Sequence, residues 1–218
     1  MTTDVQQDDS HGQLLDKIYS FQRHIYDITR KYFLFGRDRL IEKLAPSNPN
    51  SVLELGCGTG RNLFLLEKRL QNSKLFGIDA SQEMLKQASK SQPKDSTVQF
   101  AFGYAESFNQ NELFGVESFS AIFFSYSLSM MPDWKGALEK SLKVLEPGGE
   151  VWIVDFWDQG GYPAWFQKGL QKWLELFHVR FEPLLLEYLY ELESSGRVTL
   201  SVEPVGKRYG YLAKVTPL

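Results

Sequence analysis

A chain of 218 residues with 43% hydrophobic and 23% charged residues is most simply one globular domain with its own core. The net charge of −3 argues against a general nucleic-acid-binding surface, and the single cysteine allows no intramolecular disulfide. No apolar run reaches the roughly 20 residues that span a bilayer, and residues 1–12 are polar and acidic, unlike a signal peptide. We therefore expect a cytoplasmic protein in which residues 1–12 form a disordered tail and residues 13–218 a single domain.

Residues 13–45 are predicted to form a helical lid. Apolar residues over 14–32 recur at alternating steps of four and three, which places them on one face of a helix. Gly36 interrupts this pattern, and a second helical stretch follows over 37–44. Between residues 16 and 43, seven Lys and Arg outnumber four Asp and Glu. This basic stretch is either a solvated helix face or a surface for anionic cofactor groups or an acidic membrane.

A glycine-rich loop follows the lid. The apolar run 52–55 predicts a buried strand, the alternating glycines Gly56, Gly58 and Gly60 come next, and a helical pattern starts near Asn62. Glycine permits the positive φ angles of so sharp a strand-to-helix turn. The N–H groups that start the helix would point out of the turn toward a polar or anionic ligand. The loop therefore predicts a site for a nucleotide-like ligand.

Strands and helices alternate through the rest of the chain. Ser81 and Asp133 stand where they can cap the helices after the second and fourth strands. The later strands are expected at 75–78, 98–102, 119–126 and 151–154, and the last two, at 198–202 and 209–214, form a hairpin. This order predicts an α/β, Rossmann-like fold with a mostly parallel seven-stranded sheet and a C-terminal antiparallel hairpin. Residues 51–155 would be the ligand-binding core and residues 156–218 the C-terminal helices and hairpin.

The glycine spacing discriminates between nucleotide ligands. A dinucleotide loop has the form G-x-G-x-x-G, and here Gly56 and Gly58 fit its first two positions while Arg61 occupies the third. A bulky arginine there disfavours an NAD-type oxidoreductase. No Gly-Lys-Ser/Thr ending is present for a phosphate-binding loop. Asp79 ends the second strand 23 residues after Gly56, about the interval expected for one helix plus one strand.

The stretch Glu54-Leu55-Gly56-Cys57-Gly58-Thr59-Gly60 resembles the first motif of class I S-adenosylmethionine (SAM) methyltransferases. Further motifs match in order up to the turn at 145–149. The resemblance implies that the glycine loop backs the amino-acid end and ribose of SAM, and that Asp79 binds both ribose hydroxyls. It further implies that Ala80 and Met84 flank the adenine and that Ala105 and Glu106 meet the adenine amine. The remaining cofactor-binding residues implied for the core are Glu54, Gly56, Cys57, Gly58, Asp79 and Ser125.

A finer resemblance concerns the methyl acceptor. Residues 25–41, 58–63 and 125–130 are similar to bacterial diacylglyceryl-homoserine N-methyltransferases, and the likeness extends over most of 13–155. It implies a SAM-dependent N-methyltransferase that trimethylates the amine of a homoserine lipid head group to a betaine lipid. A methyltransferase for a soluble small molecule, or a SAM-binding module without catalysis, are the alternatives. The sequence leaves the oligomeric state open.

The chemistry of methyl transfer suggests which side chains line the acceptor site. A sulfonium and a quaternary ammonium both favour aromatic faces. Tyr126 is therefore the leading candidate at the transfer site, with Ser127 beside it; Tyr209 and Tyr211 are further candidates for which core packing is the alternative. A strong general base is optional, because an α-amino group titrates near pH 8.

The lid and the C-terminal region complete the predicted site. Tyr26, Arg30 and Arg37 would contact the cofactor carboxylate, which a planar guanidinium binds through both oxygens; for Arg37 a surface role is the alternative. The aromatic stretch 162–177 is a plausible wall for lipid access, with peripheral membrane contact or simple core packing as its two interpretations. The three histidines lack metal-ligand spacing, so no metal site is expected.

Overall fold

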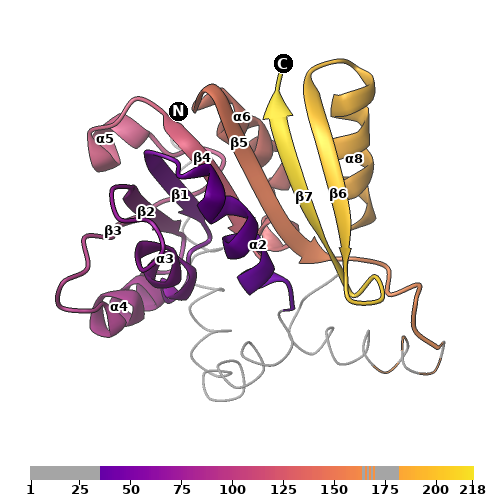
Figure 1. Ribbon diagram of the computed structural model, residues 1–218, viewed down its shortest axis with the longest axis horizontal. Coiled ribbons are helices and arrows are strands. Elements are labelled where there is room, and N and C mark those ends of the chain that lie inside the picture. Colours follow the sequence, from indigo (N-terminus) through magenta and orange to yellow (C-terminus); the bar gives the residue numbers. More distant parts are fainter. Residues whose placement is uncertain (1–34, 164, 166, 168, 170–181) are drawn as a thin grey trace, which may run out of the picture.

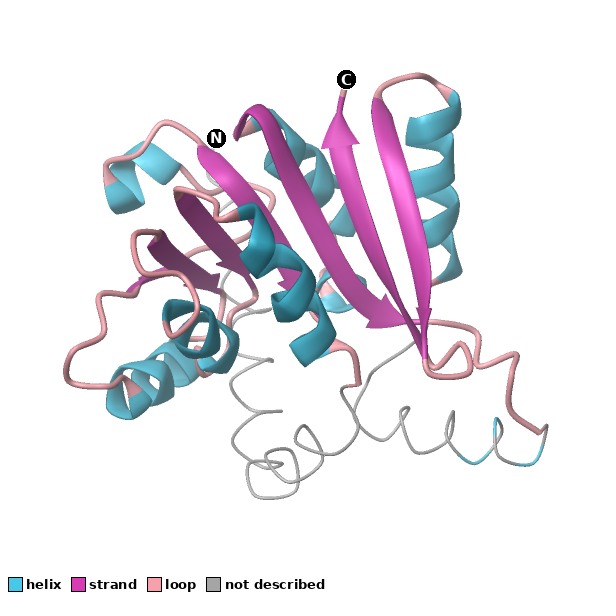
Figure 2. Ribbon diagram, viewed as in Figure 1, coloured by secondary structure: helices cyan, strands magenta, loops and turns pink. Residues whose placement is uncertain are grey.

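The computed structural model describes residues 35–163, 165, 167, 169 and 182–218. A seven-stranded sheet in the order β3-β2-β1-β4-β5-β7-β6 forms its centre, with helices on both faces (Figures 1 and 2). The strands are β1 (Ser51–Leu55), β2 (Lys74–Asp79), β3 (Gln99–Phe102), β4 (Phe119–Ser125), β5 (Leu145–Phe156), β6 (Val198–Val205) and β7 (Gly210–Pro217). The helices are α2 (Arg37–Leu44), α3 (Arg61–Glu67), α4 (Gln82–Ser91), α5 (Gln110–Phe114), α6 (Trp134–Lys143) and α8 (Pro183–Ser194), with short 3-10 turns η1 (Ala45–Ser47) and η2 (Leu128–Met130).

The predicted sheet is confirmed. Strands β1 to β5 pair in parallel, whereas β7 runs antiparallel to both β5 and β6. The strand order reverses beside β1, whose neighbours are β2 and β4. In such sheets ligands bind outside the carboxyl ends of the strands at this switch point. Leu55 pairs with Ile78 on one side and Phe124 on the other, so the segments that follow β1, β2 and β4 emerge at the same edge.

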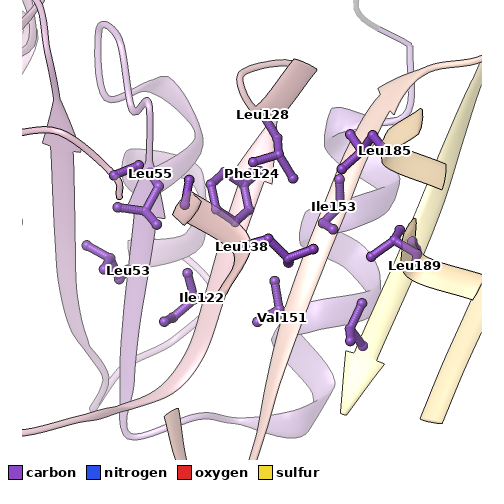
Figure 3. Close-up of a cluster of buried hydrophobic side chains, with 14 of the residues drawn as sticks. Leu53, Leu55, Ile122, Phe124, Leu128, Leu138, Val151, Ile153, Leu185 and Leu189 are labelled. Atoms are coloured by element: carbon purple, nitrogen blue, oxygen red, sulfur yellow. The ribbon is translucent and has the colours of Figure 1, made fainter. Parts of the chain in front are cut away.

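The core lies on both faces of the sheet, which is why the parallel strands read as continuous apolar runs. On one face, α5, α6 and α8 pack against β1, β4 and β5, as the close-up of Leu53, Phe124, Leu138, Ile153 and Leu189 illustrates (Figure 3). On the other face, α2, α3 and α4 cover the sheet. The buried hydrophobic residues contributed by α2 and α3 are Leu40, Ile41, Leu44, Leu63 and Leu66. The helix starts were predictable: Ser81 accepts the Met84 N–H at 3.3 Å, and Asp133 accepts the Gly136 N–H at 2.9 Å.

Two elements differ from the expectation. Strand β5 begins at Leu145 and so includes residues 147–149, which were predicted as a turn. These residues form an irregularity within the strand: Gly148 has a φ of 78°, and the register with β4 shifts there. Helix α5 was not predicted. No helix in the described ranges is long and apolar enough to cross a membrane. Residues 1–34, which include the tail and most of the predicted lid with Tyr26 and Arg30, lie outside the described residues.

Candidate active site

The glycine loop is a tight turn between β1 and α3. Gly56, Gly58 and Gly60 all have positive φ, at 73°, 54° and 75°. The Gly56 and Cys57 N–H groups donate to the Ile78 carbonyl at 2.8 and 3.0 Å, which fixes the loop to the end of β2. A Cβ on Gly56 would lie 2.5 Å from Ser127 Cβ, so a side chain is excluded there by contact as well as by backbone conformation.

Asp79 links this loop to the turn after β2. Its Oδ2 accepts the Gly58 N–H at 2.6 Å, and its Oδ1 accepts the Ser81 N–H at 2.9 Å. Ala80 and Met84, the predicted adenine-flanking residues, are half-buried at the same turn. The structure therefore brings the carboxylate, the glycine loop and the α4 turn together at one edge, as a ribose site requires.

A cavity of about 110 Å³ lies beside the loop. Its lining residues are Arg37, Glu54, Gly56, Cys57, Thr59, Arg61, Asn62 and Ser125. Glu54 is 1% exposed and its Oε1 accepts the Asn62 amide N–H at 2.7 Å. Among the described residues, the buried Ser125 hydroxyl has no hydrogen-bond partner.

The charges around this cavity suit the amino-acid end of SAM. Arg37 is buried at the start of α2 and supplies a guanidinium for a carboxylate, while Glu54 supplies a carboxylate for an ammonium. Ser125 adds a hydroxyl that a ligand can satisfy, since buried polar groups are rarely left without a partner. The residues present therefore fit the cofactor that the sequence predicts.

Tyr126 stands directly after β4 in a left-handed conformation with φ of 54°. Its N–H donates to the Val154 carbonyl at 2.8 Å, and its hydroxyl donates to the Phe35 carbonyl. Its ring contacts Phe156, whose ring in turn contacts Tyr209, with centroids 4.6 and 5.8 Å apart. Phe35 closes the group, 5.3 Å from Tyr209. Phe35, Tyr126, Phe156 and Tyr209 are called the aromatic cluster below.

The tyrosines of the aromatic cluster are neutral at physiological pH. Burial, with smaller contributions from Tyr209 and Asp155, raises the pKa of Tyr126 well above its usual value. Burial likewise raises the pKa of Tyr209, whose hydroxyl is buried without a hydrogen-bond partner in the described part of the chain. Both hydroxyls are therefore hydrogen-bond donors and poor bases.

The remaining predicted residues are distributed more widely. Ser127 donates its hydroxyl to the Leu55 carbonyl at 2.8 Å and so fastens the loop after β4 to the end of β1. Tyr211 is 1% exposed and packs in the α6 and α8 core, away from the aromatic cluster. Ala105 is buried after β3, whereas Glu106 borders a separate cavity of about 590 Å³ that Lys140 and Arg197 also line. The structure thus does not bring Tyr211 or Glu106 to the cavity beside the glycine loop.

Two polar residues at this edge escaped the sequence reasoning. Asp155 is 1% exposed at the end of β5, and burial raises its pKa to about 6. The sequence does contain a signal for Asp155: an acidic residue directly follows the apolar run 151–154, as Asp79 follows the apolar run of β2. Gln159 is buried with a φ of 59°, and its side-chain oxygen has no hydrogen-bond partner within the described ranges. No pattern in the sequence pointed to Gln159.

Comparison with known proteins finds methyltransferases. Residues 52–149 match a family model described as a methyltransferase domain. The demethylmenaquinone methyltransferase of Thermotoga maritima is 30% identical over 135 residues, 60% of this chain and 56% of that protein. The trans-aconitate 2-methyltransferase of Pseudomonas aeruginosa is 31% identical over 124 residues, 54% of this chain and 42% of that protein. The chain therefore spans about half the length of these curated relatives.

A solved structure shares the fold. The plantazolicin methyltransferase BpumL, crystallised with a monoazolic desmethylPZN analog and SAH, superposes with a TM-score of 0.72 at 14% identity, covering 96% of this chain and 95% of that chain. This likeness extends beyond the segment that the family model matches. The strand order and the glycine loop after β1 agree with the matched model: the chain has a Rossmann-like methyltransferase fold, and its residues 52–149 match a methyltransferase domain.

Proposed function

We propose that this protein transfers the methyl group of SAM to an amine, and that the amine belongs to a homoserine-type lipid head group. Repeated transfer would convert diacylglyceryl-homoserine into its trimethylated betaine lipid. The observation that carries the proposal is the aromatic cluster, which lies at the same sheet edge as the cavity with Arg37 and Glu54. Aromatic faces stabilise both a sulfonium and an amine that gains positive charge.

The residues of the cavity would hold the cofactor. Arg37 would bind its carboxylate, Glu54 its ammonium and Asp79 its ribose hydroxyls. SAM supplies an already activated methyl group, so the chain has mainly to align donor and acceptor and exclude water. An acceptor amine must be neutral to attack. Because an α-amino group titrates near pH 8, an appreciable neutral fraction exists without a base, which agrees with the neutral, hydrogen-bonded hydroxyl of Tyr126.

The lipid part of the proposal has its own support. The likeness to diacylglyceryl-homoserine N-methyltransferases extends through Tyr126 and into α2. The two most exposed large aromatic side chains among the described residues are Trp165, at 76%, and Phe35, at 54%. Phe35 belongs to the aromatic cluster, so an apolar surface adjoins the proposed acceptor site. A peripheral contact with a membrane there would deliver a lipid head group without a membrane-spanning segment.

A soluble acceptor is the second candidate. It is favoured by the relative named for trans-aconitate, a small acid, whereas the relative named for demethylmenaquinone suggests an apolar acceptor. The match covers only about half the length of each relative. The residues outside β1 to β5 are expected to determine the specificity for the acceptor.

The test is a methyl-transfer assay with isotope-labelled SAM and three acceptors: diacylglyceryl-homoserine in mixed micelles, trans-aconitate, and a demethylated quinone in the same micelles. Products are identified by mass spectrometry, and the Asp79→Ala variant controls for contaminating activity. Mono-, di- and trimethylated homoserine lipid is the expected outcome. Labelled product from either other acceptor, with none from the lipid, would overturn the lipid assignment. Absence of every product would reduce the protein to a SAM-binding module.

A further inference from the structure

Asp155 is a buried carboxylate whose hydrogen-bond partners in the described part of the chain are all neutral. Oδ1 accepts the Ser129 hydroxyl at 2.7 Å and the Phe156 N–H at 2.8 Å, and Oδ2 accepts the Ser129 N–H at 3.0 Å. None of the ion pairs among the described residues includes Asp155. Burial of a charge without a cation is costly, so stability alone gives no reason for a carboxylate at this position.

Two of the three hydrogen bonds of Asp155 hold one loop. Ser129 lies in η2, within the segment 126–131 that connects β4 to α6. The N-terminal end of this loop is fixed to β5 and β1, through the Tyr126 N–H to the Val154 carbonyl and the Ser127 hydroxyl to the Leu55 carbonyl. Asp155 provides the remaining anchor by accepting two hydrogen bonds, both from Ser129.

The same loop rests on the glycine loop of the cofactor site. A Cβ on Gly56 would lie 2.5 Å from Ser127 Cβ and 3.4 Å from Met131 Cε, so the segments are in close contact. A displacement of the loop after β4 would therefore move Tyr126 on one side and release Gly56 on the other. Misplacement of reacting groups by about 1 Å can cost on the order of a hundredfold in rate.

We propose that Asp155 is a positioning residue for methyl transfer: its ionised carboxylate holds Ser129, and through it the loop 126–131, in register with the glycine loop and the aromatic cluster. The inference rests on the proposed methyl-transfer function for its kinetic consequence. It goes beyond that function by assigning a role to a residue on the opposite face of the sheet from the cofactor cavity, where Asp155 pairs across the strands with Tyr211.

This anchor is expected to respond to pH. The ionised form accepts all three donors, whereas a protonated oxygen becomes a donor itself and loses acceptor capacity. The titratable groups that sense the charge of Asp155 are Tyr126 after β4 and Tyr211 on β7, and burial keeps both neutral. Because the pKa of Asp155 is raised to about 6, the loop should loosen as the pH falls through this value.

The first test measures turnover of Asp155→Asn, which keeps the shape but has one acceptor oxygen instead of two. We expect kcat to fall by roughly ten- to a hundredfold, with a SAM Kd within about twofold of the natural protein. The acidic limb of the natural protein's kcat/KM profile near pH 6 should disappear in the variant. Glu150→Gln, in the middle of β5, is the matched control and should retain both the activity and the acidic limb. An unchanged kcat and limb in Asp155→Asn would overturn the proposal, as would equal losses of SAM affinity and kcat.

A second measurement does not depend on activity. In the ¹⁵N-labelled protein, the Ser129 amide resonance should titrate with a midpoint near pH 6, and this titration should be absent in Asp155→Asn. Ser129→Ala, which removes only the hydroxyl donor, gives the same comparison if Asp155→Asn fails to fold, and it should lower kcat in the same direction. A titrating Ser129 amide in a protein without methyl transfer would refute the proposed function but leave the anchor intact. A Ser129 amide that does not titrate between pH 5 and pH 7.5 would refute the anchor itself.

Discussion

Replacement of Asp79 by alanine should weaken SAM binding by a predictable amount. In the structure Asp79 accepts two backbone N–H groups, from Gly58 at 2.6 Å and from Ser81 at 2.9 Å, and so shapes the site as well as offering acceptors to a ribose. A hydrogen bond to a charged group contributes about 1.5–3 kcal/mol. Loss of one such net contribution corresponds to a rise in Kd of about 10- to 150-fold.

Isothermal titration calorimetry with SAM measures this change directly. Asp95→Ala is the matched control, because Asp95 is exposed in the turn before β3 and should leave the affinity unchanged. The melting temperature of each variant separates lost affinity from lost folding. An Asp79→Ala protein that folds and binds SAM as tightly as the natural one would mean that the ribose does not lie at the end of β2.

Gly56→Ala should lower the free energy of unfolding by about 2–4 kcal/mol, because this position has a positive φ and an added Cβ would lie 2.5 Å from a neighbouring atom. Gly115 also has a positive φ, 67°, but open space around it, so Gly115→Ala should lower the free energy of unfolding by only about 1 kcal/mol. Urea denaturation measures both changes. Equal losses would refute the steric argument. Arg37→Lys should raise the SAM Kd on the order of tenfold, because a point charge replaces a planar fork, while Arg39→Lys at the surface should leave it unchanged. The ionisation of Asp155 should make the protein less stable as the pH rises from about 4 to 6, because the pKa of Asp155 is about 6 in the folded protein and ordinarily 3.8. The resulting loss in the free energy of unfolding, about 3 kcal/mol, should be absent when Asp155→Asn is unfolded over the same pH range.

Most of the sheet could be predicted because its determinants are local. The apolar runs that become β1, β2 and β4 are buried on both faces, so hydrophobicity alone marks them. Glycines at 56, 58 and 60 mark the turn because the backbone needs their positive φ. Capping by Ser81 and Asp133 depends only on residues three positions away. The resemblance to SAM methyltransferases added the order of these elements, and residues 52–149 match a methyltransferase-domain model.

The acceptor side could not be predicted to the same depth because its contacts are distant in sequence. The hydroxyl of Tyr126 reaches the Phe35 carbonyl 91 positions earlier, and Asp155 reaches Ser129 26 positions earlier. Tyr209 and Tyr211 are two positions apart, a spacing that would place them on one face of a strand. Tyr209, however, precedes β7 whereas Tyr211 lies within it, and the two pack in separate core clusters, so only Tyr209 joins the aromatic cluster. Their assignment as acceptor-lining residues stays a prediction.

The position of Cys57 gives the protein a chemical reporter of its own cofactor loop. It is the only cysteine in the chain, it is 4% exposed, and its sulfur would lie 2.8 Å from a Cβ on Gly77 of β2. A thiol reagent can reach this sulfur only when the loop departs from β2. The rate of thiol modification therefore measures the opening of the loop in the natural sequence, without an introduced label. Bound SAM should slow that rate, so the same reaction gives a competition assay for cofactor analogues.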